Sequence, residues 1–371
     1  MLAGSNLVRV RAPLPTRRPL PTAGEVGQGG IGFVDCNADG SDGEALTDYD
    51  LIGSAESRRG LFALAAAPWF NFLCIPAPQP GTDLGLATVL VAQRLCRQRQ
   101  ALLLLDPPQA WTDAEVALAQ LPQWPVRSAD ALLCFPAVRC EDVQGGGWCT
   151  GSSAAVLAGL LARAEAGMFR WWDASPPPLQ PGDPARPAVA VTAVQRTQLA
   201  RHGVNTLVDA LDIAAARLPV TVLLDAELRV ERRLVARRLQ LWIAASIERT
   251  TRWALTTPPA QWATVRGKVA DQVLVLLERL QQDRALQAAG LVGECFVLCD
   301  RRLNPDQASP ASPFRLVWGV IGTRPDQGCA WLVTHQAAGS SSRPVSVNRQ
   351  SVAGTRVAGE IETDILRNPS R

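Results

Sequence analysis

The chain has 371 residues, of which 47% are hydrophobic and 19% are charged, as is typical of a folded globular protein of about two domains. Its formal net charge of +3 comes from 37 basic and 34 acidic residues, a balance that argues against a nucleic-acid-binding surface. The best candidate for a membrane span, residues 61–75, is interrupted by Pro68 and Asn71, so we expect no direct membrane insertion. Nine irregularly spaced cysteines and the lack of a signal peptide predict a protein that is cytoplasmic when made.

The first 30 residues are rich in proline, arginine and glycine, and they predict an N-terminal arm without a core of its own. Residues 6–12 alternate like a short strand that includes Val8 and Val10. This segment could add one strand to the open edge of a sheet.

An alternation of apolar runs and helical patterns begins near residue 60. Phe70–Ile75, Ala101–Leu105 and Ala131–Phe135 are short apolar runs that predict buried strands. Helices are expected after these strands: one capped by Thr82 or Asp83, a short one following Thr112, and one capped by Ser152 or Ser153. Strands separated by helices indicate βαβ units. Further strand candidates are Val189–Thr192 and Val220–Leu224.

Two long amphipathic helices occupy much of residues 230–290. Their apolar side chains recur three or four residues apart, and Pro258-Pro259 separates the two helices. The apolar run Cys295–Cys299 then predicts another buried strand, in which the two cysteines are core thiols. The expected fold is α/β, with a mixed, largely parallel sheet flanked by helices and with extended N- and C-terminal arms.

The C-terminal part contains two extended apolar segments, Phe314–Ile321 and Cys329–His335. We divide the chain into an N-terminal arm (1–30), an α/β core (31–304), C-terminal strands or an arm (305–336) and a polar tail (337–371). With this division, deletion of residues 314–336 is expected to leave a folded subunit.

A series of motifs along residues 38–335 resembles contractile tail sheath proteins of phages and related injection machines. In the C-terminal half the resemblance is carried by a doubled arginine in a helix, a tryptophan after a proline break, F-V-x-C-D and a nearby asparagine. Shorter motifs lie earlier in the chain, and they follow one another in the same order as in the family. The residues are Ala38–Gly43, Ile75-Pro76, Asp106-Pro107, Phe135-Pro136, Ala158–Arg163, Gly203–Asn205, Arg237-Arg238, Trp262, Phe296–Asp300 and Asn304.

The resemblance implies a structural subunit that polymerises around an inner tube and contracts to drive the tube through a target envelope. The implied partners are further copies in hexameric rings, the inner tube protein, baseplate and terminator proteins, and a longer sheath paralogue. No enzyme activity, cofactor, metal or nucleic acid is implied. Subunits are expected to join by strand addition. The expected interface residues are Val8, Val10, Leu316, Trp318, Val320, Trp331 and Val333.

The sequence also departs from the sheath pattern. Two segments, Asp173–Pro176 and Leu224–Glu227, differ from the sequences that the family usually has at these positions. Only about forty residues precede the Ala38–Gly43 loop. Recombinant protein of this sequence is therefore expected to assemble poorly or only with a longer sheath partner. A sheath-like protein that has lost assembly is a further alternative.

Three other motifs allow chemical alternatives. Gly147–Gly151 matches a nucleophile elbow with Cys149 at its centre and His202 downstream, although a strand leading into the nucleophile is not evident. An α/β hydrolase using Cys149 is the alternative function. Asp35–Gly40 resembles the start of a calcium loop, but Leu46 stands where the bidentate carboxylate belongs. Gly145–Ser153 could hold an anion at a helix start, without a lysine or a Walker pattern nearby.

Overall fold

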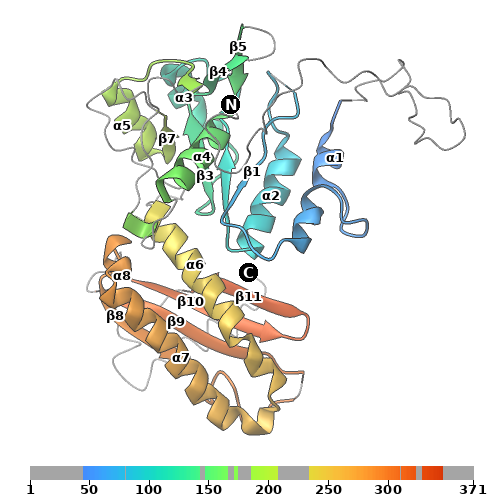
Figure 1. Cartoon of the computed structure of the whole chain (residues 1–371), viewed down its shortest axis with the longest axis vertical. Helices are drawn as coiled ribbons and strands as arrows, with labels where there is room; N and C mark the ends of the chain where they lie inside the picture. The colour runs from blue at the N-terminus through green and yellow to red at the C-terminus, as the bar shows by residue number, and fades with distance from the viewer. Residues whose placement is uncertain are drawn as a thin grey trace, which may run out of the picture. The chain divides into compact units, whose positions relative to one another are not determined.

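A computed structural model describes residues 45–79, 81–142, 147–165, 171–173, 185–207, 234–309, 311–322 and 328–345 (Figure 1). The predicted N-terminal arm with Val8 and Val10, the Asp35–Gly40 loop and the strand candidate Val220–Leu224 lie outside the described residues. The described part begins with the short helix α1 (Asp48–Ile52) and the 3-10 helix η2 (Gly60–Ala66).

The first sheet is parallel and has the strand order β1-β2-β3-β7. Three of its strands lie where the apolar runs predicted them, and β7 falls on the G-x-N segment. The strands are β1 (Phe72–Cys74), β2 (Leu102–Leu105), β3 (Ala131–Phe135) and β7 (Val204–Thr206). Every side chain of β2 and β3 is buried, which explains their unbroken apolar sequences.

Helices cover both faces of this sheet. Leu103 and Leu133 pack with residues of α2 (Leu86–Gln98), α3 (Ala114–Gln120) and α5 (Ala193–Arg201) on one face. Leu102 and Leu132 pack with α4 (Ser153–Glu165) on the other. The start of α2 differs from the expectation, because Gly85 precedes it, whereas α3 follows Thr112 as predicted and is capped by Asp113 through the amides of Glu115 and Val116.

A small antiparallel sheet follows β3 and was not predicted. It has the order β5-β4-β6 and consists of β4 (Val138–Asp142), β5 (Gly147–Gly151) and β6 (Ala185–Pro187). The candidate strand Val189–Thr192 is not a strand, and Thr192 instead caps α5 through the amide of Gln195. Two further 3-10 turns, Leu121–Gln123 (η3) and Trp171–Asp173 (η4), connect elements in this half.

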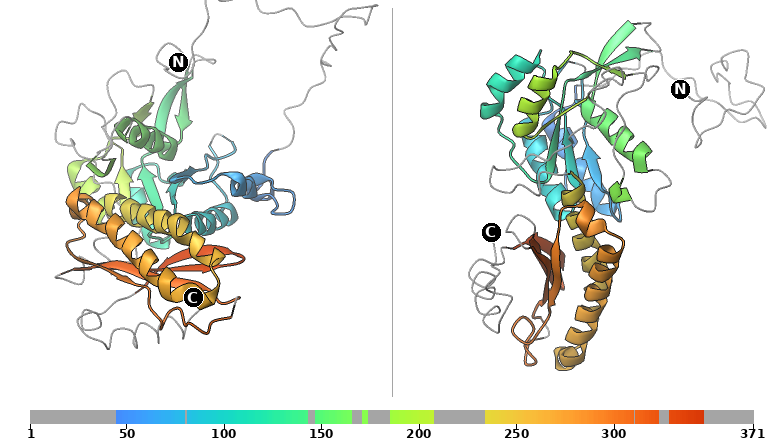
Figure 2. Two further views of the ribbon diagram at one scale, coloured as in Figure 1. Left: turned by 60° about the horizontal axis from the view of Figure 1, so that its bottom comes forward. Right: turned by 90° about the vertical axis from the view of Figure 1, so that its left-hand side faces the viewer.

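The C-terminal half consists of a pair of long helices packed on one face of an antiparallel sheet (Figures 1 and 2). The helices are α6 (Leu234–Thr251) and α7 (Trp262–Gln282), separated by the 3-10 turns η6 (Arg252–Thr256) and η7 (Pro259–Gln261). The short helix α8 (Ala285–Ala288) follows. The proline break and the two apolar stripes are therefore confirmed.

The antiparallel sheet has the order β11-β10-β9-β8. Its strands are β8 (Gly293–Leu298), β9 (Phe314–Gly322), β10 (Cys329–Gln336) and β11 (Gly339–Pro344). Two expectations are thereby corrected. The largely parallel sheet is one parallel sheet accompanied by two antiparallel ones, and the segment assigned to a polar tail begins with a paired strand.

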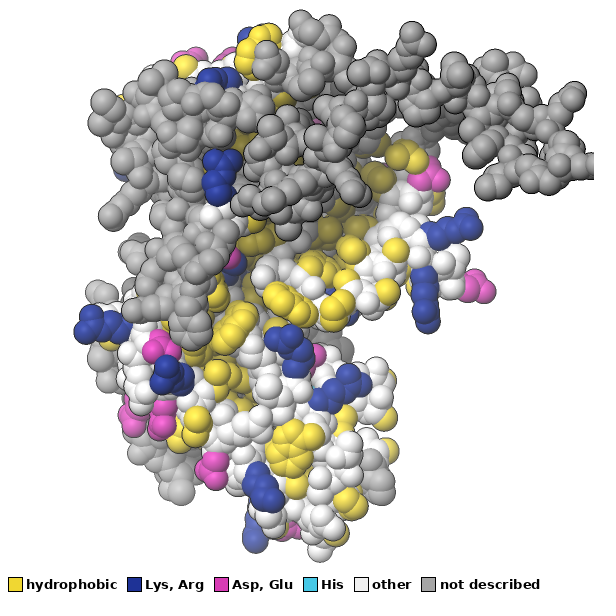
Figure 3. Space-filling view, viewed as in Figure 1, with side chains coloured by type: hydrophobic (Ala, Val, Ile, Leu, Met, Phe, Trp, Pro, Cys, Tyr) yellow, Lys and Arg dark blue, Asp and Glu magenta, His cyan; other side chains and the backbone are white. Residues whose placement is uncertain are grey.

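Two surface properties bear on function. Within the described residues, no helix combines the length and apolar character that crossing a membrane requires. On the face drawn in Figure 3, the arginine and lysine side chains of the described residues lie among uncharged and acidic ones rather than in one continuous patch. The described residues visible on this face therefore form no continuous basic patch of the kind that binds nucleic acid.

Candidate functional site

The doubled arginine of α6 connects that helix to the parallel-sheet half. The Arg237 guanidinium donates to Asp130 Oδ1 from Nη2 at 2.5 Å and from Nε at 3.2 Å. Both side chains are buried, and Asp130 lies immediately before β3. The guanidinium also lies 5.3 Å from the ring centroid of Trp331 on β10. Arg237 thus joins the parallel sheet, α6 and the antiparallel sheet through one side chain.

Arg238 makes a second connection on the neighbouring face of α6. It forms a bidentate ion pair with Glu165 at the end of α4, with Nη2 2.9 Å from Oε2. Its guanidinium lies 4.6 Å from the ring centroid of Phe72 and 4.5 Å from that of Trp171. A planar guanidinium can stack and form two hydrogen bonds at once, which an ammonium group cannot do. The arginine pair therefore has a structural role in this chain.

The ion pair of Arg237 provides a direct test of its role in stability. We expect Arg237→Ala to lower the free energy of unfolding by about 3 kcal/mol, because it leaves the Asp130 carboxylate buried without its closest partner. Arg97 is the matched control, since its Nε lies 3.3 Å from the same carboxylate but its side chain is 67% exposed, against 5% for Arg237. Arg97→Ala should cost less than about 1 kcal/mol. Equal effects in denaturant titrations would contradict the assignment.

Asn304 and Trp262 fix the antiparallel sheet to its helices. The Asn304 side chain accepts from the Arg315 amide and donates to the Arg315 carbonyl, both at 2.7 Å, as a neighbouring strand would. Its own carbonyl accepts from Arg266 of α7 at 2.7 Å. Trp262 is buried edge-on against Phe314 of β9, with ring centroids 5.3 Å apart. These motif residues are therefore part of the scaffold.

The expected interface side chains lie inside this scaffold. All five that the structure describes are buried in the core between the sheet and its helices: Leu316, Trp318, Val320, Trp331 and Val333. They belong to β9 and β10, and each of these strands already has a strand partner on both sides. The assignment of residues 314–336 as a free arm is therefore wrong, because their main-chain groups are used within the chain.

The edges of the sheet are formed by β8 and β11. β11 pairs with β10 from Gly339↔Gln336 to Pro344↔Trp331, and the Val345 amide extends this pairing by donating to the Ala330 carbonyl at 2.9 Å. Hydrogen-bonded and non-hydrogen-bonded pairs alternate along an antiparallel ladder. The amides of Ser341 and Arg343 therefore point towards β10, and those of Ser340 and Ser342 point to the open side. The edge carries two outward donors, followed by a proline that has none.

His335 is a buried histidine beneath this edge. Its two ring nitrogens lie 2.8 Å from Thr251 Oγ1 and 2.8 Å from Ser340 Oγ, respectively. Burial lowers the pKa of His335 to about 4, and the positive charge of Arg252 adds to the effect. The folded state therefore holds this imidazole neutral where the unfolded chain, with an ordinary histidine pKa of about 6.5, would bind a proton.

This histidine should make stability depend on pH. Because the unfolded chain binds the extra proton, the free energy of unfolding falls as the pH drops from about 6.5 to about 4, by up to roughly 3 kcal/mol. His335→Gln should remove that part of the pH dependence in denaturant titrations. His202→Gln, which changes an exposed histidine at the C-terminus of α5, is the matched control for replacing a histidine by glutamine. The same pH dependence in wild type and His335→Gln would contradict the prediction.

The sites suggested for chemistry do not form a catalytic group. Cys149 lies on the exposed strand β5, and its thiol donates to the Cys140 carbonyl at 3.5 Å. Among the described residues the hydrogen bonds of Cys149 do not include His202. No group of three or more metal-ligating side chains occurs in the part of the chain that the structure covers. Cys295 and Cys299 are thiols whose pKa is raised by burial, to about 12 for Cys299.

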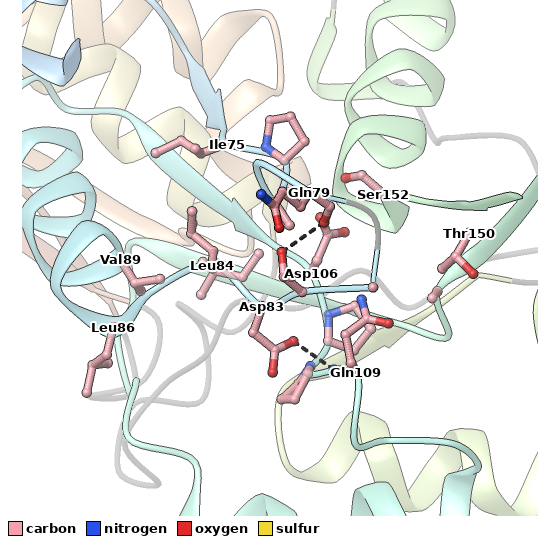
Figure 4. Close-up of a pocket in the computed structure, with 18 of the residues that line it drawn as sticks. Ile75, Gln79, Asp83, Leu84, Leu86, Val89, Asp106, Gln109, Thr150 and Ser152 are labelled. Atoms are coloured by element: carbon pink, nitrogen blue, oxygen red, sulfur yellow. Dashed lines mark hydrogen bonds between the residues drawn. The ribbon is translucent and has the colours of Figure 1, made fainter. Parts of the chain in front are cut away.

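A cavity of about 420 Å³ lies at the carboxyl ends of β1 and β2 (Figure 4). Asp83 on its wall accepts from the Gln109 amide at 2.8 Å, and Asp106 accepts from the Ala154 amide at 2.8 Å. Both carboxylates thus fix the loops and the start of α4. None of the described residues that line the cavity is a lysine, an arginine or a histidine.

Comparison with known proteins gives a similarity in structure but none in sequence. No family model matches the chain, and no curated protein matches it in sequence. Among solved structures the chain is similar to a sheath protein of the PVC sheath complex of an extracellular contractile injection system, in its contracted state. The sequence identity is 17%, 68% of each chain is covered, and the TM-score is 0.49.

Proposed function

We propose that this chain is a structural subunit of a contractile tail sheath, which polymerises around an inner tube and contracts to drive it through a target envelope. The observation that carries the proposal is the structural role of the residues that make up the sheath-like motifs. Arg237, Arg238, Trp262 and Asn304 all build one scaffold of helices and sheet, through buried contacts within the chain. A resemblance concentrated in residues that shape a scaffold fits a protein whose function is its shape and assembly.

Assembly is proposed to use the main chain of a sheet edge. The side chains of β9 and β10 that were expected at the subunit interface are buried within the chain itself. We therefore assign the subunit contact to the edge strand β11, where the amides of Ser340 and Ser342 point outward. An added strand from a neighbouring copy would bind these amides by main-chain hydrogen bonds. Such bonds depend little on side-chain shape, so a joint of this kind can persist while subunits change their relative orientation.

The proposed partners are further copies in hexameric rings and an inner tube protein. A longer sheath paralogue, a baseplate and a terminator protein are the remaining partners that the sequence resemblance implies. Contraction would need no bound cofactor, because the energy would come from rearrangement of a metastable lattice into a more stable one. The hydrolase alternative has little support, because Cys149 lies on an exposed strand without a bond to His202.

The β11 edge can be tested with two substitutions at one residue. Ser342→Pro removes an outward amide while leaving the inward amides of Ser341 and Arg343 to pair with β10. Ser342→Ala is the matched control, because the Ser342 hydroxyl also donates to Glu248 at 2.8 Å and both variants lose that bond. We expect both variants to fold, and only Ser342→Pro to lose rings or tubes in electron micrographs. Equal assembly of the two variants would show that β11 is not the contact edge.

A further inference from the structure

Two cysteines face each other across the unpredicted hairpin. Cys140 on β4 and Cys149 on β5 are directly paired in the register of the two strands, and both are free thiols. The Ala188 amide donates to the Ala137 carbonyl, so Ala137 forms a hydrogen-bonded pair towards β6. By alternation, Cys140 forms a hydrogen-bonded pair with Cys149, for which the Cα atoms lie about 5.5 Å apart. That separation is close to the commonest one in disulfides, about 5.5–6 Å.

The surroundings of the pair leave room for the two sulfurs. Cys149 is exposed on an outer strand of its sheet, and both of its neighbours on the same face of β5 are glycines, Gly147 and Gly151. The Cys140 sulfur lies over Gly151, where an added Cβ would come within 2.8 Å of it. Directly paired residues project from the same face of a sheet. Rotation of the two side chains can therefore bring the sulfurs together without passing a bulky group.

The two thiols differ in accessibility. Cys149 is exposed, and Cys140 is partly buried. Burial raises the pKa of the Cys140 thiol, and negative charge on Cys149 would raise it further. Most other described cysteines have thiols whose pKa is raised by burial within cores, as for Cys96 and Cys134. An oxidant in solution therefore reacts first with the Cys149 thiol, and the paired Cys140 can then attack the oxidised Cys149 sulfur.

We propose that Cys140 and Cys149 form a reversible intramolecular disulfide, with a low-molecular-weight disulfide such as glutathione disulfide as the oxidant. The Cys149 thiolate attacks one sulfur of the oxidant, whose S–S bond breaks and releases one glutathione thiolate. The Cys140 thiolate then attacks the Cys149 sulfur and releases the second. The two cysteines lose two electrons to the oxidant, and their two protons go to the released thiolates.

This disulfide should be easily reduced. The Cβ atoms of a hydrogen-bonded pair are about 5.5 Å apart, wider than the roughly 3.5–4.5 Å of a relaxed disulfide. The bond would therefore pull β5 towards β4, and strained or exposed disulfides are the labile ones. The site would lock the hairpin under oxidising conditions and release it under reducing ones. This inference is independent of the proposed sheath function.

Peptide mapping of the full chain tests the site, because one tryptic fragment contains both thiols. Cleavage after Arg139 and Arg163 releases residues 140–163, which contain Cys140 and Cys149 and no other cysteine. After glutathione disulfide and an alkylating reagent, this fragment should lose two hydrogen atoms and resist alkylation. An excess of reduced glutathione should restore both thiols.

Two variants make the result specific. Cys140→Ser should stop at the first step and retain glutathione on Cys149. Cys295→Ser is the control with a cysteine changed elsewhere, and its 140–163 fragment should behave as in wild type. A wild-type fragment that keeps two alkylated thiols, or that retains glutathione as fully as the Cys140→Ser fragment, would overturn the proposal.

Discussion

A chain that lacks residues 314–336 is expected to fail to fold. The deletion removes β9 and β10, the two central strands of the antiparallel sheet. It also removes nine buried hydrophobic side chains: Phe314, Leu316, Val317, Trp318, Val320, Ala330, Trp331, Leu332 and Val333. Burial of each large side chain contributes about 1.5–3 kcal/mol, and the whole chain's stability is about 5–15 kcal/mol. The remaining chain could not retain its C-terminal core.

This expectation reverses the one drawn from the sequence, and a matched truncation separates the two. A chain that ends at Val345 retains all four strands of the sheet, and we expect it to unfold cooperatively as the full chain does. Thermal unfolding followed by circular dichroism would compare the two truncations. A cooperative transition in the chain lacking residues 314–336 would show that β9 and β10 are dispensable for the core.

Trp262→Ala should lower the free energy of unfolding by roughly 3–5 kcal/mol, the usual cost of emptying a large buried aromatic site. Trp262 begins α7, is 2% exposed and packs edge-on against Phe314. Its indole Nε1 donates to the Thr257 carbonyl at 3.2 Å, which holds the turn between α6 and α7. Alanine would lose both the packing and this hydrogen bond.

Trp253 provides a control of the same residue type. It lies in η6, is 37% exposed and donates to Gln272 Oε1 at 3.2 Å. Trp253→Ala should cost less than about 1.5 kcal/mol, because its ring is only partly buried. Chemical denaturation of the two variants gives the comparison. A cost below about 1 kcal/mol for Trp262→Ala would mean that Trp262 does not anchor the helix pair.

The elements with strong apolar periodicity could be predicted from the sequence. The unbroken apolar runs of β2 and β3 indicated buried strands, and the stripes of α6 and α7 indicated amphipathic helices. The hairpin β4–β5 could not be found in this way. Gly147–Gly151 is exposed and glycine-bounded, so it has neither an apolar run nor an alternating pattern. The two strands become recognisable as a pair only in the structure, where Cys140 lies directly opposite Cys149.

The candidate interface shows why strand prediction alone does not give topology. Phe314–Ile321 and Cys329–His335 were correctly predicted as extended, but their apolar character was assigned to a partner rather than to the chain's own helices. The decisive element was β11, a serine-rich segment whose polar sequence resembles a tail. Its pairing with β10 makes β10 an internal strand. Likewise, Asp130 gave no sequence signal of its contact with Arg237, which lies 107 residues further along the chain.

Electron microscopy of the full chain co-expressed with its inner tube protein tests the proposed sheath function most directly. The tube protein is expected to be encoded in a neighbouring reading frame. The proposal predicts rings or tubes in which this chain surrounds the inner tube, and loss of those assemblies in Ser342→Pro but not in Ser342→Ala. Dispersed single-chain particles beside bare inner tubes would contradict it.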